Sequence, residues 1–169
     1  ARSICLDAYA TDSAGKKYDI EVQRADNGAD PHRARYHSSV MDVENLDEKQ
    51  DYKELPDTYV IFITENDYYK AGEPVYTIQN MNLTLNRPFN DGAHILYVNG
   101  EYRDESEIGR LMHDFNCTSA DEMNFELLAE RTRYLKENPK GVGSMCKAME
   151  DLRVESYAEG KAEGVEIGK

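Results

Sequence analysis

The chain has 169 residues, of which 40% are hydrophobic and 31% are charged, a composition typical of one globular domain with a hydrophobic core. Its formal net charge of −13 opposes non-specific binding to nucleic acid, because phosphate contacts require Lys and Arg, although a bound metal ion or a local basic patch can outweigh the total. The sequence shows no signal peptide and no apolar run long enough for a membrane span. Its three cysteines lack zinc-binding spacing, so we expect a reducing, cytoplasmic location.

The segment 4–23 predicts a β-hairpin. Apolar and polar residues alternate on both sides of Ser13-Ala14-Gly15, as they do in strands with one buried face. A three-residue loop that ends in Gly suits a type I turn followed by a left-handed residue. The alternating apolar positions are Ile4, Leu6, Ala8, Tyr18, Ile20 and Val22.

This turn sets the register of the hairpin and pairs two acids. If Asp12 faces Lys16, then Asp7 lies opposite Glu21, on the same face of the hairpin and with Cβ atoms about 5 Å apart. Two carboxylates placed like this repel each other unless a cation lies between them, and Mg²⁺ prefers such ligands. The pair therefore indicates a metal site. A solvated acidic face would give the same pattern, and a register slip of one residue would separate the acids.

A helix is predicted to begin at Asp30-Pro31 and to run to about Leu46, because Asp is a good N-cap and Pro is favoured at the first helical position. Arg33 and Arg35 lie in its first turns. They are either surface charges or groups that face the end of the preceding strand and contact a phosphate or a carboxylate there. The four histidines are scattered, and we expect surface or packing roles for them. The expected buried side of the helix is Tyr36, Val40, Met41 and Val43.

The β-branched and aromatic run at 58–64 predicts a strand buried on both faces, and hence in the centre of a sheet. A strand, a helix and such a strand in succession are typical of α/β proteins. Further strands that extend the edge of the sheet are expected at 75–78 and 94–98, with a short strand at 83–85 between them.

The remainder of the chain predicts helices. Apolar stripes mark them, Ser119 begins a capping signal between the first two, and Pro139 ends the second. The expected helices cover 105–116, 125–138 and 145–157, followed by a Glu/Gly/Lys-rich tail at 157–169. We therefore expect a core at 1–100, a helical extension at 101–156 and the tail at 157–169.

Four segments of the chain together resemble the PD-(D/E)xK nuclease family transposases, which are bacterial recombination-promoting nucleases. They are LDAYATDSAGKKYDIEVQ, RARYHSSVMD, DYKELP and TYVIFIT, and the ending AEGKAEGVEIGK is similar to the repeats that end many members. The resemblance implies a restriction-endonuclease-like α/β fold, in which helices flank a mixed β-sheet, with a helical C-terminal portion. The chain opens almost directly in a strand, so we expect the family's N-terminal helix and first strand to lie upstream.

The resemblance also implies roles for particular residues. Asp7 and Glu21 would be the metal carboxylates for Mg²⁺ or Mn²⁺, with the carbonyl of Val22 as a third ligand. Gln23 stands where the general motif has Lys, and it would be catalytic by orienting the attacking water, although a neutral amide cannot stabilise developing negative charge as an ammonium does. Arg33 and Arg35 would then bind the substrate and supply that charge.

The sequence thus favours a metal-dependent DNA endonuclease of the mobile-element type that acts on double-stranded DNA, and a homo-oligomer is a further expectation. One alternative is a weakly active or inactive descendant that serves as an interaction module, which accommodates the charge of −13. Another is a metal-dependent phosphodiesterase acting on small nucleotides, for which a basic groove is not needed.

Overall fold

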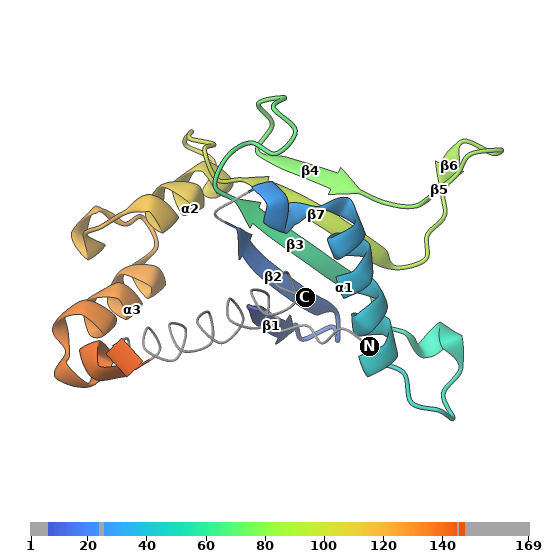
Figure 1. The fold of residues 1–169 in the computed structure, drawn as a ribbon, viewed down its shortest axis with the longest axis horizontal. Helices are drawn as coiled ribbons and strands as arrows, with labels where there is room; N and C mark the ends of the chain where they lie inside the picture. Colours follow the sequence, from blue (N-terminus) through green and yellow to red (C-terminus); the bar gives the residue numbers. More distant parts are fainter. Residues whose placement is uncertain (1–6, 24–25, 145, 148–169) are drawn as a thin grey trace, which may run out of the picture. The chain divides into compact units, whose positions relative to one another are not determined.

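The computed structural model describes residues 7–23, 26–144 and 146–147 (Figure 1). The described residues divide into two compact units, with the boundary after Met112. Residues 4–6 of the first predicted strand, nearly all of the third predicted C-terminal helix and the whole tail lie outside the described residues. The first unit holds the sheet and the site, and the second consists of short helices.

The first unit is built on a mixed five-stranded sheet with the order β1-β2-β3-β7-β4. The central strands β2, β3 and β7 are parallel to one another, while β1 and β4 pair antiparallel at the two edges. This arrangement confirms the predicted α/β fold with a mixed sheet. The strands are β1 (Ala8–Thr11), β2 (Lys17–Gln23), β3 (Thr58–Thr64), β4 (Val75–Ile78) and β7 (Ala93–Asn99).

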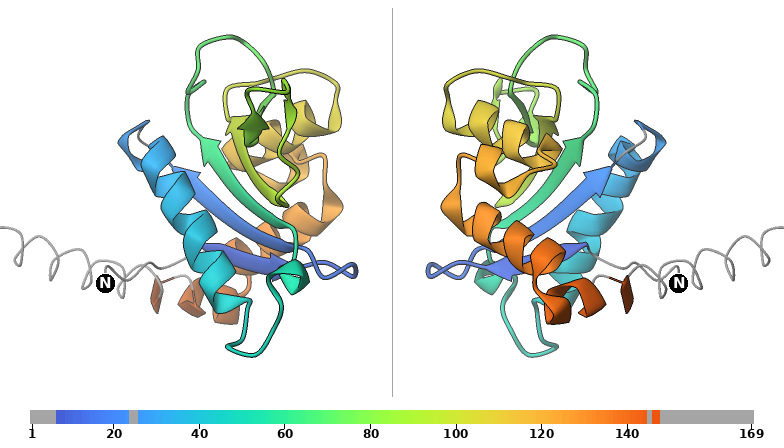
Figure 2. Two further views of the ribbon diagram at one scale, coloured as in Figure 1. Left: turned by 90° about the vertical axis from the view of Figure 1, so that its right-hand side faces the viewer. Right: turned by 90° about the vertical axis from the view of Figure 1, so that its left-hand side faces the viewer.

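Helix α1 (Pro31–Glu44) follows β2 after a short 3₁₀ turn, η1 (Asp26–Ala29), and packs on β3 (Figure 1 and Figure 2). As predicted, Asp30 caps it, since the Asp30 carboxylate accepts the N–H of His32 at 2.7 Å. A second 3₁₀ turn, η2 (Tyr52–Glu54), lies between α1 and β3. The core between helix and sheet contains Ala29, Ala34, Met41, Val60, Phe62 and Tyr97.

The hairpin formed by β1 and β2 has the predicted register, but its buried face is not the one that carries the apolar positions. Asp19 and Glu21 are completely buried, whereas Val22 is 55% exposed and the described part of β1 is exposed throughout. In the parallel register Glu21 lies beside Phe62, so the acidic face of β2 continues the core face of β3. The apolar positions of β2 take the other face.

The buried side of α1 also differs from the prediction. Of the four residues expected there only Met41 is fully buried, while Tyr36 and Val43 are exposed. Ala34 and His37 are buried instead. The helix turns this more polar side inward because the carboxylates on β2 need hydrogen-bond partners once they leave water.

The strand at 58–64 is central, as predicted, but β7 lies inside the sheet and only β4 forms the edge beyond it. The short strand expected at 83–85 is absent from the described structure, where residues 83–86 form a turn. That turn joins β5 (Met81–Asn82) to β6 (Arg87–Pro88), which form a separate two-stranded sheet.

Helix α2 (Glu107–Asn116) leads into the second unit, which contains η3 (Ala120–Glu122) and α3 (Glu126–Glu137). Ser119 caps η3 and α3 ends directly before Asn138-Pro139, both as predicted. The N-terminus of α3 is held by Asp114, whose carboxylate accepts the N–H groups of Asn124 and Phe125 at 2.8 to 2.9 Å. Burial alone would raise the pKa of Asp114, but these donors outweigh it and lower the pKa to about 2.

Candidate metal centre

The turn of the first hairpin has the geometry that its sequence predicts. Gly15 has a φ of +84°, and its N–H donates to the Asp12 carbonyl at 3.1 Å. The Asp12 N–H donates to the Lys16 carbonyl at 3.1 Å, so these two residues close the ladder. Tyr9 then pairs with Asp19, and continuing the register brings Asp7 opposite Glu21.

Asp7 and Glu21 lie next to each other, but main-chain groups hold their carboxylates. The Asp7 N–H donates to Glu21 Oε1 at 3.1 Å, and the Val22 N–H donates to Asp7 Oδ2 at 3.1 Å. Asp7 is exposed at the edge of the sheet, whereas Glu21 is buried beneath α1. The pair therefore joins a solvent-accessible carboxylate to a buried one.

Arg33 supplies the positive charge beside Glu21. Its Nη2 lies 2.7 Å from Glu21 Oε2, and its Nη1 donates to the Gly28 carbonyl at 3.0 Å and to Gln23 Oε1 at 3.4 Å. The Gln23 amide in turn donates to Glu21 Oε2 at 3.4 Å. The Arg33 guanidinium also lies over the ring of Phe62, at 5.9 Å from its centroid. Arg33 and Gln23 thus converge on one oxygen of Glu21.

His37 and Asp19 form a second buried pair one turn further along α1. His37 Nδ1 lies 2.7 Å from Asp19 Oδ2, and Arg33 Nε donates to His37 Nε2 at 3.3 Å. His37 therefore links the Asp19 carboxylate to the Arg33 guanidinium. Neither Asp19 nor His37 was predicted to belong to the site, and His37 was expected to have a surface or packing role. The sequence did contain a signal for this network. Asp19 and Glu21 lie two residues apart on a strand, and the next helix carries Arg33 and His37 four residues apart, which places each pair on one face.

The pKa of Glu21 reflects its burial and the charged groups around it. Burial raises its pKa, and the nearby charges of Asp7 and Asp19 raise it further, while the Asp7 N–H and His37 offset part of the effect. A cation placed among these groups would favour the ionised form of Glu21 and relieve the repulsion.

The residues present fit a divalent cation. Ligand atoms of Asp19, Glu21 and His37 all lie within 4.8 Å of one another, and Asp7 adjoins the group. The buried Asp19 Oδ1 has no hydrogen-bond partner among the described residues, although an uncompensated buried carboxylate oxygen is costly. The carboxylate oxygens suit Mg²⁺ or Mn²⁺, whereas an imidazole nitrogen is not a ligand that Mg²⁺ favours. Arg33 provides the compensating charge in this structure.

The structure separates Arg35 from this group. Its side chain lines a groove of about 310 Å³ between α1 and the β4–β7 edge, together with Ser38, Ser39 and Asp42. Burial raises the pKa of Asp42, and the charge of Asp91 across the groove adds to the effect. Of the predicted site residues, Asp7, Glu21, Val22, Gln23 and Arg33 are therefore brought together, and Arg35 is not.

Among the described helices, none combines the length and the hydropathy that a membrane span requires. Comparison with curated proteins and with solved structures found no match. The family model of the PD-(D/E)XK nuclease family transposases matches residues 1–110, which include the sheet, α1 and the buried acidic group. The chain therefore belongs to the PD-(D/E)XK nuclease family transposases.

Proposed function

We infer that this protein is a metal-dependent DNA endonuclease of the recombination-promoting type. The observation that carries the proposal is the hairpin register, which brings Asp7 beside the buried Glu21 in a member of a nuclease family. Carboxylates gathered in this way need a compensating positive charge, which Arg33 supplies here and which a divalent ion would supply in a nuclease that acts on a phosphodiester.

In this proposal Asp7, Glu21 and the carbonyl of Val22 hold Mg²⁺ or Mn²⁺. The bound ion would polarise the scissile phosphate and lower the pKa of a coordinated water. Gln23, whose amide already lies against Glu21, would orient the attacking water for in-line displacement of the 3′ oxygen. Asp19 and His37 would keep Arg33 and Glu21 in position through the buried hydrogen-bond network.

Arg33 would exchange partners when the ion binds. It now neutralises Glu21 at 2.7 Å, and a divalent ion at the same carboxylate would repel the guanidinium. Once released, Arg33 can contact a phosphate oxygen and supply the positive charge that Gln23 lacks. Arg35, which lies in a separate groove, would contact the DNA backbone away from the scissile bond.

The same ion pair favours one rival function. Both oxygens of Glu21 are engaged, by Arg33 and by the Asp7 N–H, so the site could be a purely structural network in a non-catalytic interaction module. The two functions differ in whether a divalent ion displaces Arg33.

Plasmid relaxation with Mg²⁺ or Mn²⁺ tests the proposal. The full chain should nick supercoiled DNA, while Asp7→Asn and Glu21→Gln should lose at least about a hundredfold in rate, since each removes a metal ligand. Glu48→Gln, a change at an exposed acid in the loop after α1, is the matched control and should keep full activity. Cleavage that survives in both site variants would show that these acids are not the metal ligands.

Several broader assignments belong to this proposal. We place the protein in the bacterial cytoplasm, with double-stranded DNA as the substrate and a homo-oligomer as the working form. We also assign residues 1–100 to the nuclease core, 101–156 to a helical extension and 157–169 to the tail. Gel filtration with light scattering measures the oligomeric state directly.

A further inference from the structure

We propose that residues 79–92, the arm that carries β5 and β6, bind DNA, an inference that rests on the proposed function. The arm leaves the edge strand β4 after Ile78 and returns to β7 at Ala93 (Figure 1). These positions lie level with Ile95 and Thr58 in the sheet, whereas Gln23 of the metal centre lies at the opposite end of its strand. The arm is therefore separate from the proposed catalytic residues.

Large apolar side chains gather on the arm and face solvent. Leu83 is 88% exposed and Phe89 is 64% exposed, and Met81 and Leu85 are exposed as well. Single exposed apolar residues are normal, but four within nine residues on a small two-stranded sheet indicate a binding surface.

The charge of the arm favours DNA over a second copy of this chain. Residues 74–90 form the longest stretch without Asp or Glu in a chain that contains 33 of them. Arg87 is the only charged residue in this stretch, and while its backbone pairs with Asn82, its side chain makes no hydrogen bond or ion pair with the described residues. The one acid of the arm, Asp91, accepts a hydrogen bond from the Asn80 amide. A phosphate backbone meets less repulsion here than over the rest of an acidic protein. A second copy carries the same charge of −13 and offers no such complementarity.

The arm is held in shape by its own hydrogen bonds. The Phe89 N–H donates to the Asn80 carbonyl at 2.9 Å, and the Asn80 amide donates to Asp91 at 2.7 Å. At the tip, the Leu85 N–H donates to Asn82 Oδ1 at 3.1 Å. Little conformational entropy is therefore lost when the arm binds.

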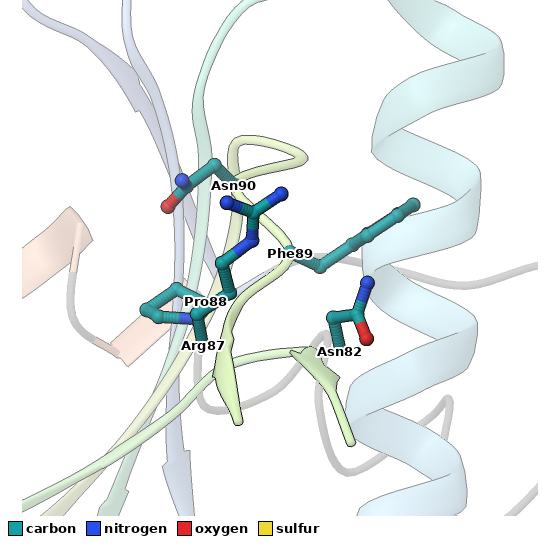
Figure 3. Close-up of a pocket in the computed structure, with 5 residues that line it drawn as sticks. All are labelled: Asn82, Arg87, Pro88, Phe89 and Asn90. Atoms are coloured by element: carbon teal, nitrogen blue, oxygen red, sulfur yellow. The ribbon is translucent and has the colours of Figure 1, made fainter. Parts of the chain in front are cut away.

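A hollow of about 300 Å³ on the arm collects the groups that recognise nucleobases. Figure 3 shows its lining, which consists of Asn82, Arg87, Pro88, Phe89 and Asn90. Guanidinium and amide groups hydrogen-bond to base edges, and aromatic rings stack on bases. The major groove of B-DNA admits a two-stranded β-ribbon. Arg87 then supplies the ionic contact, while Leu83 and Phe89 pack against bases.

Fluorescence anisotropy with a labelled 25-base-pair duplex and the full chain tests the arm. Divalent ions are removed with EDTA, so that cleavage cannot interfere. Arg87→Ala should weaken binding about tenfold and reduce the slope of log K against log salt by about one, because one phosphate or base contact is lost. Leu83→Ser should weaken binding without changing the slope.

Matched controls are Arg110→Ala and Leu127→Ser, at an exposed arginine on α2 and a leucine on α3 that is 80% exposed. Both should bind like the unchanged chain. If Arg87→Ala and Leu83→Ser bind DNA normally, the arm is not a DNA contact. The inference also fails if sedimentation shows that Leu83→Ser dissociates a dimer while its DNA affinity is unchanged. Neither result bears on the proposed nuclease activity, which is tested separately by the loss of cleavage in Asp7→Asn.

Discussion

Arg33→Met removes the positive charge beside Glu21 and keeps much of the side-chain volume. Breaking a buried ion pair costs about 3–5 kcal/mol when the remaining charge is fully enclosed. Here Glu21 is buried but the Arg33 side chain is 38% exposed, so water can reach the vacated position. We therefore expect a loss of about 2 kcal/mol in the free energy of unfolding, measured by urea denaturation in EDTA.

Mn²⁺ should restore the stability of this variant. A divalent ion takes over the charge that Arg33 supplied, and at a hundred times its Kd it stabilises the folded state by about 2.7 kcal/mol. The unchanged chain should gain less, because there the ion must displace Arg33. Arg110→Met is the control and should respond like the unchanged chain. If Arg33→Met has normal stability in EDTA, or does not respond to Mn²⁺, the interpretation of Arg33 as the counter-ion of the metal centre is wrong.

Three other changes test the fold. Gly15→Ala should destabilise the protein by about 1 kcal/mol in urea denaturation, because a φ of +84° is unfavourable for Ala although the site has space for a methyl group; equal stability would contradict the turn geometry. Phe62→Ala should cost about 3–5 kcal/mol by opening a cavity under α1, and a loss below 1 kcal/mol would place Phe62 outside the core. Asp114→Asn should cost about 2 kcal/mol at pH 6, because the folded pKa of Asp114 lies near 2, below its unfolded value. A lowered pKa contributes its full stability above the unfolded pKa and loses it as the pH falls towards the folded pKa. The difference in free energy of unfolding between Asp114→Asn and the unchanged chain should therefore close as the pH falls from 4 towards 2. A constant difference would refute the role of this carboxylate.

The sequence was most informative where local chemistry decides the structure. The turn ending in Gly15 fixes the hairpin register, and the register alone places Asp7 opposite Glu21. The apolar run of β3 made its central position predictable, although only one face of the strand is fully buried and the other is half-buried. Asp30-Pro31 determines the start of α1 because capping involves only neighbouring residues.

The parts that were not predicted depend on pairs of residues distant in sequence. Alternation in β2 indicates two faces but does not say which is buried, and here Arg33 and His37 on α1 make burial of the acidic face favourable. His37 looked unremarkable because its partner, Asp19, lies 18 positions away. Arg35 shares a helix with Arg33, but two residues along a helix point to different sides, so it lies in another groove.

Isothermal titration calorimetry of the full chain with Mn²⁺ tests the metal centre most directly. We expect one ion to bind the unchanged chain, and Asp7→Asn and Glu21→Gln each to weaken that binding at least tenfold, with Glu48→Gln as the unaffected control. Equal affinity in all four proteins would contradict the assignment of Asp7 and Glu21 as metal ligands.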